Sequence, residues 1–203
     1  MKKAIIGFAA ALLLTGCGAP APTVPPMKPV VIDPAADPQL HAEDGYLPLD
    51  QTIAAQIAMQ MYVPQALGWY KTSDSTVCYS DRSGSNLITF EYRRGDEFSR
   101  CYAAYLHDLG TALPAERIRT YDPQTVGTGD YTAMRIDVRE QEQDQPERCI
   151  TYWFINQPHG EHERIGCYIV TLDTTAENLD IMMPAINSFS TLRDWQQTAG
   201  KET

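Results

Sequence analysis

Positive charge is scarce in this chain. Its 203 residues include 16 lysines and arginines but 26 aspartates and glutamates, which gives a formal net charge of −10. No segment gathers the basic residues into a stripe that could neutralise phosphates, so a general role in binding nucleic acid is disfavoured. The same balance disfavours direct docking onto anionic lipid headgroups and is typical of a solubilising surface.

Catalytic signatures are also missing from the sequence. There is no G-x-S-x-G nucleophile elbow, no S-x-x-K, no Walker loop and no dinucleotide fingerprint. His107 and Asp108 are adjacent on one expected helix, so their side chains diverge and do not form a pair. These absences favour a protein that is not an enzyme, and we assign no catalytic residue.

Long apolar runs are confined to the N-terminus. Residues 1–3 form a short basic head, and the apolar run over 4–14 is shorter than the about 20 residues that a membrane-spanning helix needs. The run leads into Leu14-Thr15-Gly16-Cys17, which resembles the lipobox read by bacterial prolipoprotein-processing enzymes. Residues 1–16 are therefore predicted to be a lipoprotein signal peptide. An ordinary secretory signal or a retained membrane anchor is the alternative.

The lipobox resemblance implies that Cys17 carries a diacylglyceryl lipid and becomes the mature N-terminus. Two or more acyl chains hold a protein on a membrane durably, whereas one does so only marginally. Loss of Lys2 and Lys3 with the signal would leave 14 basic and 26 acidic residues, a net charge of −12. Gly18 follows the cysteine, which permits transfer to the outer membrane in a bacterium with two membranes. The predicted location is extracytoplasmic, on a bacterial membrane.

Proline marks the segment that follows. Residues 17–48 contain eight prolines among many small residues, a composition that favours extended, polyproline-like conformations and acts as a semi-rigid spacer. Residues 49–195 are predicted to form a single α+β domain, and 196–203 a polar tail. About 150 residues suffice for one domain with its own core.

Four cysteines follow the expected lipidation site: Cys78, Cys101, Cys149 and Cys167. None belongs to a C-x-x-C pair, so neither a zinc ribbon nor a thioredoxin-like centre is indicated, and four cysteines allow three pairings. A hairpin turn centred on Pro158 would set Cys149 opposite Cys167, and we expect this disulfide. Elimination then predicts a bond between Cys78 and Cys101. Buried free thiols are the alternative.

Three helices are expected in the folded part. Asp50 can cap a helix over 51–61, and residues 97–109 carry an i, i+3, i+4 apolar stripe that Gly110 would end. Residues 174–177 (Thr-Thr-Ala-Glu) fit a capping box with Thr174 as the cap of a last helix, which Pro184 should kink or loosen.

Strand patterns fill the space between these helices. Residues 76–80 and 87–92 predict a hairpin, and 116–121 is strand-like. Residues 131–140 alternate as a half-exposed strand does, and 148–156 and 164–172 are the strongest strands. Because short turns join neighbouring strands, we expect an α+β fold with a mostly antiparallel sheet of about six strands flanked by helices.

A family resemblance covers roughly residues 62–192. It rests on Pro64 and Trp69 at the opening, then a strand pair, a helix and a meander. The meander ends in Tyr152-Trp153-Phe154 with a partner strand over 168–172, and the domain closes on Ile186-Asn187-Ser188-Phe189. This order resembles the domain of PsbP, the extrinsic photosystem II protein, and of bacterial lipoproteins related to DcrB. The resemblance implies a binding or assembly module.

Three clusters suggest ligands. His159 and His162, within residues 159–163, are weak candidates for binding zinc or copper, but a solvated turn between two strands is the preferred interpretation. The acidic residues of 140–147 could bind calcium, but they lack the EF-hand spacing. A solvated hairpin tip is the preferred interpretation. The aromatic run 152–154 could stack on a sugar or an aromatic ligand, but a sheet covered on both faces explains it without a ligand and is the preferred interpretation. We therefore predict no metal site and no cofactor other than the lipid on Cys17.

These patterns together predict a lipid-anchored, extracytoplasmic, non-catalytic binding or assembly module of the bacterial cell envelope. Its predicted partners are the membrane, through the lipid, and an unknown envelope protein or small ligand, with no nucleic acid. Two alternatives stay open: a secreted metal-dependent or hydrolytic enzyme, and a structural envelope protein.

Overall fold

An antiparallel sheet is the framework of the domain in the computed structural model, which describes residues 45–73, 76–128, 131–141, 145–156 and 166–194. Seven strands follow the order β4-β5-β6-β11-β10-β9-β7, and an eighth, β8, also pairs with β9. The strands are β4 (Trp69–Thr72), β5 (Thr76–Ser80), β6 (Leu87–Arg94), β7 (Ile118–Thr120), β8 (Gln124–Val126), β9 (Tyr131–Glu140), β10 (Arg148–Asn156) and β11 (Gly166–Thr175). The α+β fold class is confirmed, and β4 and β8 enlarge the sheet beyond the six strands expected.

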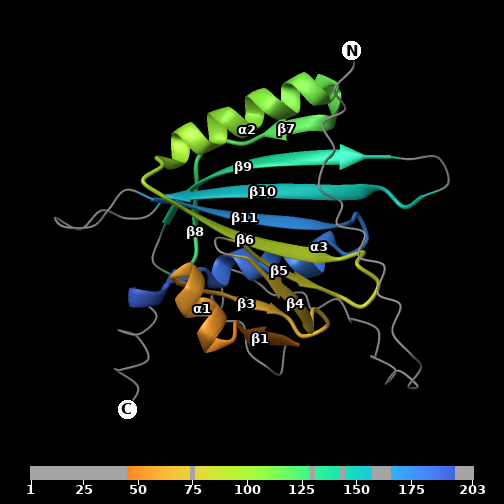
Figure 1. Ribbon diagram of the computed structural model, residues 1–203. Helices are drawn as coiled ribbons and strands as arrows, with labels where there is room; N and C mark the ends of the chain where they lie inside the picture. The colour runs from red at the N-terminus through yellow and green to blue at the C-terminus, as the bar shows by residue number, and fades with distance from the viewer. Residues whose placement is uncertain (1–44, 74–75, 129–130, 142–144, 157–165, 195–203) are drawn as a thin grey trace.

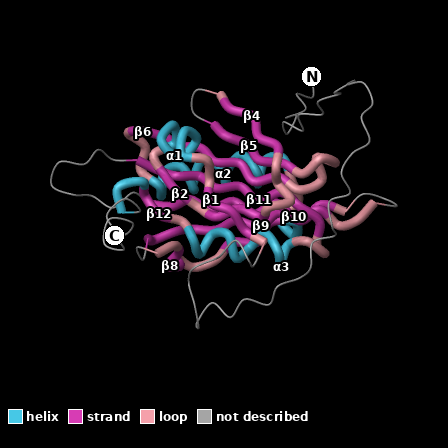
Figure 2. The backbone as a smooth tube through the Cα atoms, turned by 90° about the horizontal axis from the view of Figure 1, so that it is seen from below, coloured by secondary structure: helices cyan, strands magenta, loops and turns pink. Residues whose placement is uncertain are grey.

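Helices cover both faces of this sheet (Figure 1). Helix α2 (Phe98–Ala112) packs on one face, against β9, β10 and β11. The other face carries α1 (Gln51–Ile57), α3 (Leu179–Met182) and the 3-10 helix Met183–Ser188. Two short antiparallel pairs complete that layer: β1 (Tyr46–Pro48) with β3 (Tyr62–Pro64), and β2 (Met59–Gln60) with β12 (Ser190–Thr191). Figure 2 shows α1, α3 and the short strands together on this side.

Alternation along the strands divides the core into two clusters. In β10, Trp153 and Ile155 belong to the cluster under α1 and α3, whereas Phe154 belongs to the cluster under α2. Successive side chains of a strand point to opposite faces, so an aromatic run in this strand supplies both layers. Coverage of both faces thus explains the aromatic run 152–154 without a ligand.

Helix boundaries differ from the expectation at several points. Asp50 caps α1 as predicted, because its Oδ1 accepts from the Thr52 backbone N–H at 2.8 Å. The helix ends at Ile57 and not at residue 61 as expected. Ala58, the residue after Ile57, adopts a left-handed conformation with φ 55°. Helix α2 continues through Gly110 to Ala112, so the predicted glycine stop is wrong. Glycine only permits a helix end, and here Leu109 and Leu113, on either side of Gly110, both pack against the cluster under α2.

The predicted capping box at Thr174 is wrong. Strand β11 extends through Thr175, and the fully buried Thr174 donates its hydroxyl hydrogen to the side-chain oxygen of Asn86. Helix α3 begins at Leu179 and passes at Met183 into a 3-10 helix. The loosening expected near Pro184 is confirmed, because proline cannot donate the intrahelical hydrogen bond.

The first strand lies earlier than the expected domain boundary at residue 49. Tyr46 is 2% exposed, and its hydroxyl donates to the Ile181 carbonyl at 2.6 Å. Pro48 faces Tyr62 in the β1–β3 pair, a position at a sheet edge that proline tolerates. Proline-rich composition therefore concealed a short strand at the end of the expected spacer.

The register of β10 and β11 corrects the predicted disulfides. Cys149 faces Thr174, and Cys167 faces Asn156, so the two cysteines lie at opposite ends of the hairpin. They also point to opposite faces of the sheet, because facing residues share a face and neighbours alternate. The predicted Cys149–Cys167 disulfide is therefore wrong, because a disulfide needs Cα atoms about 4.4–6.8 Å apart. The pairing of Asn156 with Cys167 differs from the register that a turn centred on Pro158 would give.

None of the helices in the described residues is both long and apolar enough to cross a bilayer. The predicted signal peptide, Cys17 and most of the spacer lie outside the described residues, as does the polar tail.

Candidate functional site

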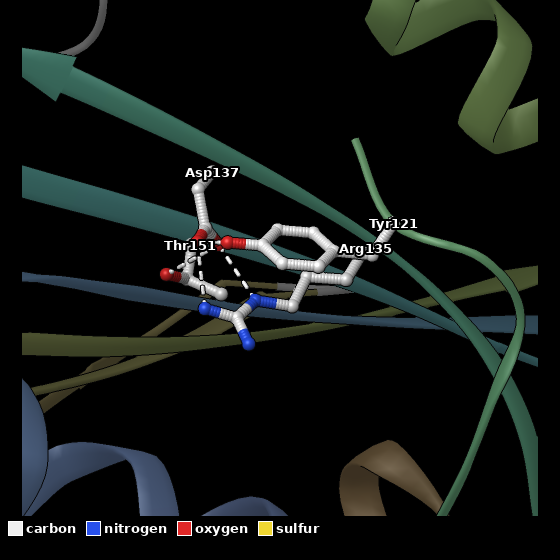
Figure 3. A network of polar contacts seen from close by, with 4 residues as sticks. All are labelled: Tyr121, Arg135, Asp137 and Thr151. Carbon is white, nitrogen blue, oxygen red and sulfur yellow. Dashed lines mark hydrogen bonds and ion pairs between the residues drawn. The ribbon is translucent and has the colours of Figure 1, made fainter. Parts of the chain in front are cut away.

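The candidate site is a polar corner on the face of the sheet that carries α1 and α3. Arg135 and Asp137 lie two residues apart on β9, so both side chains point to this face. Thr151 of β10 faces Asp137 across the ladder, and Trp153 faces Arg135. Tyr121, which follows β7, completes the group, and its backbone N–H donates to the Arg135 carbonyl at 3.3 Å. Figure 3 shows the four polar side chains converging.

Asp137 is the centre of this network. Arg135 binds it in a bidentate manner, with Nε donating to Oδ1 at 2.7 Å and an Nη2 hydrogen donated to Oδ2 at 2.6 Å. The Tyr121 hydroxyl donates to Oδ2 at 2.7 Å, and Thr151 Oγ1 donates to Oδ1 at 3.0 Å (Figure 3). Four donors occupy this carboxylate, so it does not serve as a free general base.

Aromatic rings hold the guanidinium in place. The Arg135 guanidinium carbon lies 4.3 Å from the Tyr121 ring centroid and 5.3 Å from that of Trp153. Its side chain is only 15% exposed, so cation–π attraction is weakly screened here. Arg119 also stacks over Tyr121, at 4.8 Å. A planar cation held by two rings and one bidentate carboxylate is pre-organised, with little entropy left to lose on binding a ligand.

Two donors at this corner lack a partner within the described residues. Nη1 of Arg135 takes no part in the bonds to Asp137, and the indole Nε1 of Trp153 is buried without a hydrogen-bond acceptor. An unsatisfied buried N–H costs free energy comparable to a lost hydrogen bond. Trp153 is only 2% exposed, so of the two donors it is the Arg135 guanidinium, on a side chain that is 15% exposed, that can donate to an acceptor such as a carboxylate, a phosphate or a carbonyl oxygen.

Burial raises the pKa of the Tyr121 hydroxyl, and its hydrogen bond to the Asp137 carboxylate adds to the effect. The phenol consequently stays protonated and keeps donating to Asp137 throughout the neutral range. Its role is to position the carboxylate, which in turn orients Arg135.

The sites predicted from the sequence fall elsewhere. His159 and His162 lie outside the described residues, as does Cys17. Within the described ranges no group of three or more His, Cys, Asp or Glu side chains is placed to hold a metal ion. At the acidic hairpin, Glu147 pairs with Arg139 at 3.0 Å, and Glu140 lies 4.0 Å from Arg148. Two of the acidic side chains of 140–147, those of Glu140 and Glu147, are therefore engaged in ion pairs with arginines.

Sequence reasoning missed the Arg135 corner. The signal was present as two opposite charges two residues apart on an alternating strand, which places both on one face. Nothing in the sequence indicated that Thr151 would face Asp137, because this depends on the register of a long hairpin. The sequence predicted Tyr121 as the last residue of a strand over 116–121, but β7 ends at Thr120, so strand alternation does not set the direction of the Tyr121 side chain.

Comparison with known proteins finds structural likenesses of low identity. No protein-family model and no curated protein matches the chain. Among solved structures, the Ran-binding protein Mog1p of Saccharomyces cerevisiae is similar over 72% of this chain and 95% of its own, at 8% identity and a TM-score of 0.46. The PsbP of Synechocystis sp. PCC 6803 (CyanoP) is similar over 72% and 92%, at 8% identity and a TM-score of 0.45.

LpqN of Mycobacterium tuberculosis, described as involved in cell envelope biogenesis, is similar over 71% of this chain and 75% of its own, at 11% identity and a TM-score of 0.38. The chain spans less than half, 45%, of a further similar structure, from Bacteroides thetaiotaomicron. At these TM-scores the likenesses carry no argument about function.

Proposed function

We propose that this protein is a lipid-anchored, extracytoplasmic binding module of the bacterial cell envelope and that it is not an enzyme. Cys17 carries the lipid, the proline-rich segment spaces the domain from the membrane, and the domain binds an envelope protein or a small ligand. The lipobox and the spacer support the location, and the polar corner at Arg135 supports the binding role.

The observation that carries the proposal is the saturation of Asp137. A catalytic carboxylate must reach the proton it abstracts, but all four hydrogen bonds to Asp137 come from the protein itself. Its neighbours are an arginine, a tyrosine held protonated and a threonine that donates to it. A rigidly held guanidinium whose Nη1 makes no bond to Asp137 suits recognition of an acidic or carbonyl group.

Membrane attachment is tested by Cys17→Ser. The wild-type protein should stay with membranes after a carbonate wash and incorporate a labelled fatty acid. The Cys17→Ser protein should do neither, because thioether attachment needs the sulfur. A Cys17→Ser protein that remains membrane-bound after the wash contradicts the anchor.

Binding is tested by isolating the lipidated protein from its own envelope and identifying bound proteins and small molecules by mass spectrometry. The variant Arg135→Gln/Asp137→Asn removes both charges together, so neither is left buried and unpaired. Its matched control is Arg139→Gln/Glu147→Gln, which neutralises an exposed pair on the same strand and hairpin.

The proposal predicts that a species bound to wild type is lost from Arg135→Gln/Asp137→Asn and kept by the control. Equal retention by both variants contradicts a role for the corner. Turnover of an envelope component by the purified protein contradicts the non-enzymatic role.

A further inference from the structure

Cys101 and Cys167 meet where α2 crosses β11. Cys101 lies on the packed face of α2 and is 3% exposed, and Cys167 in β11 is fully buried. Both belong to the apolar cluster under α2, with Ile169 and Phe154. Each thiol lies close enough to the other to influence its pKa. Two buried cysteines from segments far apart in the chain are therefore neighbours where α2 packs on β11.

The other two cysteines lie elsewhere. Cys149 faces Thr174 on β11 and therefore points to the opposite face of the sheet from Cys167. Cys78 faces Thr89 on β6, whereas Cys167 faces Arg93 of that strand. Cys78 is thus on β5, two strands from β11 and four residues out of register with Cys167. Neither Cys78 nor Cys149 comes within disulfide reach of the Cys101–Cys167 pair.

We propose that Cys101 and Cys167 form a disulfide that ties α2 to β11 at the centre of the sheet, while Cys78 and Cys149 remain thiols. The inference rests on the extracytoplasmic location in the proposed function, because that compartment keeps disulfides oxidised. The bond joins helix α2, whose apolar stripe packs on the sheet, to β11, the strand at the middle of the strand order.

The oxidation requires a disulfide donor of the thiol–disulfide oxidoreductase class. One cysteine thiolate attacks the donor disulfide, which forms a mixed disulfide and releases one donor thiolate. The second cysteine thiolate then attacks the protein sulfur of that mixed bond, and the second donor thiolate leaves. The protein loses two protons and two electrons, and the donor gains them as two thiols.

Burial determines when this step takes place. It raises the pKa of both thiols, so little thiolate exists in the folded domain. The bond therefore forms during folding, before α2 closes over β11. Once closed, the same burial shields the sulfurs from reductants, so the disulfide behaves as a structural one.

Peptide mapping tests the pairing. The full-length protein is isolated from the envelope without reductant, its free thiols are alkylated in denaturant, and the digest is analysed by mass spectrometry. We expect a linked peptide pair joining Cys101 to Cys167, with Cys78 and Cys149 alkylated. Cys101→Ser abolishes the link and frees Cys167, whereas the controls Cys78→Ser and Cys149→Ser retain it.

Thermal unfolding supplies a second readout. After reduction in denaturant and refolding with reductant present, the wild-type protein should melt about 10 °C lower than its oxidised form, whereas the same treatment should leave the melting temperature of Cys101→Ser/Cys167→Ser unchanged. An equal response of both proteins to reductant overturns the proposal, as does a link between any other two of these cysteines.

A refolding experiment tests the Cys101–Cys167 pairing independently of the proposed extracytoplasmic location. Purified full-length protein is reduced, unfolded and refolded in glutathione redox buffer. A Cys101–Cys167 link in this buffer but free thiols in the cell would uphold the pairing and contradict the extracytoplasmic location. Free thiols at both positions in both settings overturn the pairing itself.

Discussion

Gly127 has less room for a side chain than Gly45, Gly68, Gly84, Gly95 and Gly110. Its φ is +73°, and a Cβ placed there would lie 2.3 Å from the Phe189 carbonyl oxygen. Contact with backbone cannot be relieved by moving a flexible side chain. The close approach allows the Thr128 N–H to donate to that same carbonyl at 2.9 Å, which joins the β8–β9 turn to the end of the 3-10 helix.

Gly127→Ala should therefore destabilise the domain by about 3 kcal/mol or more, because strain and overpacking add. Gly84→Ala is the matched control, since Gly84 has a φ of +72° with open space around its Cβ position. It should cost only about 1 kcal/mol from backbone strain. Urea unfolding measures both, and equal losses would contradict the close approach at Phe189.

Asp137→Asn should cost about 3 kcal/mol of unfolding free energy, because it leaves the Arg135 guanidinium without its counter-charge at a nearly buried site. The side chains of this pair are 15% and 11% exposed. Glu147→Gln breaks a pair whose arginine is 57% exposed and should cost less than about 1 kcal/mol. Losses of the same size in both variants, measured by denaturant unfolding, would refute the distinction between these pairs.

Tyr152 should make stability fall at high pH. Burial foremost, with the nearby Asp173 charge, raises the pKa of Tyr152 to about 12, above the value of about 10 in an unfolded chain. The neutral phenol is favoured in the folded state, so this stabilisation is complete below pH 10 and is lost as pH rises towards 12. Its full size is at most about 3 kcal/mol. Tyr152→Phe should flatten the curve of unfolding free energy against pH between about pH 10 and 12. A variant curve with the same slope as wild type would contradict the assignment of this pH dependence to Tyr152.

Among the elements, those with strict alternation were predictable, and those decided by tertiary contacts were not. Strand β9 matches the expected 131–140 because polar and apolar side chains alternate in it. The end of β11 was mistaken for a helix cap because Thr174 satisfies its hydroxyl through Asn86, a residue distant in sequence. The Arg135 corner was missed for the same reason, since its partners meet only through the register of β10 and β7.

Helix α1 shows how much one cap contributes to a short element. It has seven residues, fewer than an isolated helix needs to be stable in water. Asp50→Ala removes the acceptor for the Thr52 N–H and should destabilise the domain by about 1 kcal/mol. Asp50→Ser keeps an N-cap oxygen and should restore most of that loss. If both variants unfold at the same urea concentration, the cap is not what stabilises α1.

At the scale of the whole molecule, composition and periodicity predicted an α+β fold with a mostly antiparallel sheet, which the structure confirms. The predicted disulfide in the last hairpin depended on locating a turn within a polar segment, and a shift of the turn centre moved Cys149 far from Cys167. Spatial proximity between α2 and β11, which brings Cys101 to Cys167, is a property of packing that no local pattern contains.

The anchored state of the whole protein is the central claim, and the intact mass of the protein extracted from membranes with detergent tests it most directly. We predict a mature chain that begins at Cys17, lacks residues 1–16 and carries the added mass of a diacylglyceryl group on that cysteine. A membrane-extracted chain that retains residues 1–16, or that has an unmodified Cys17, would contradict the account.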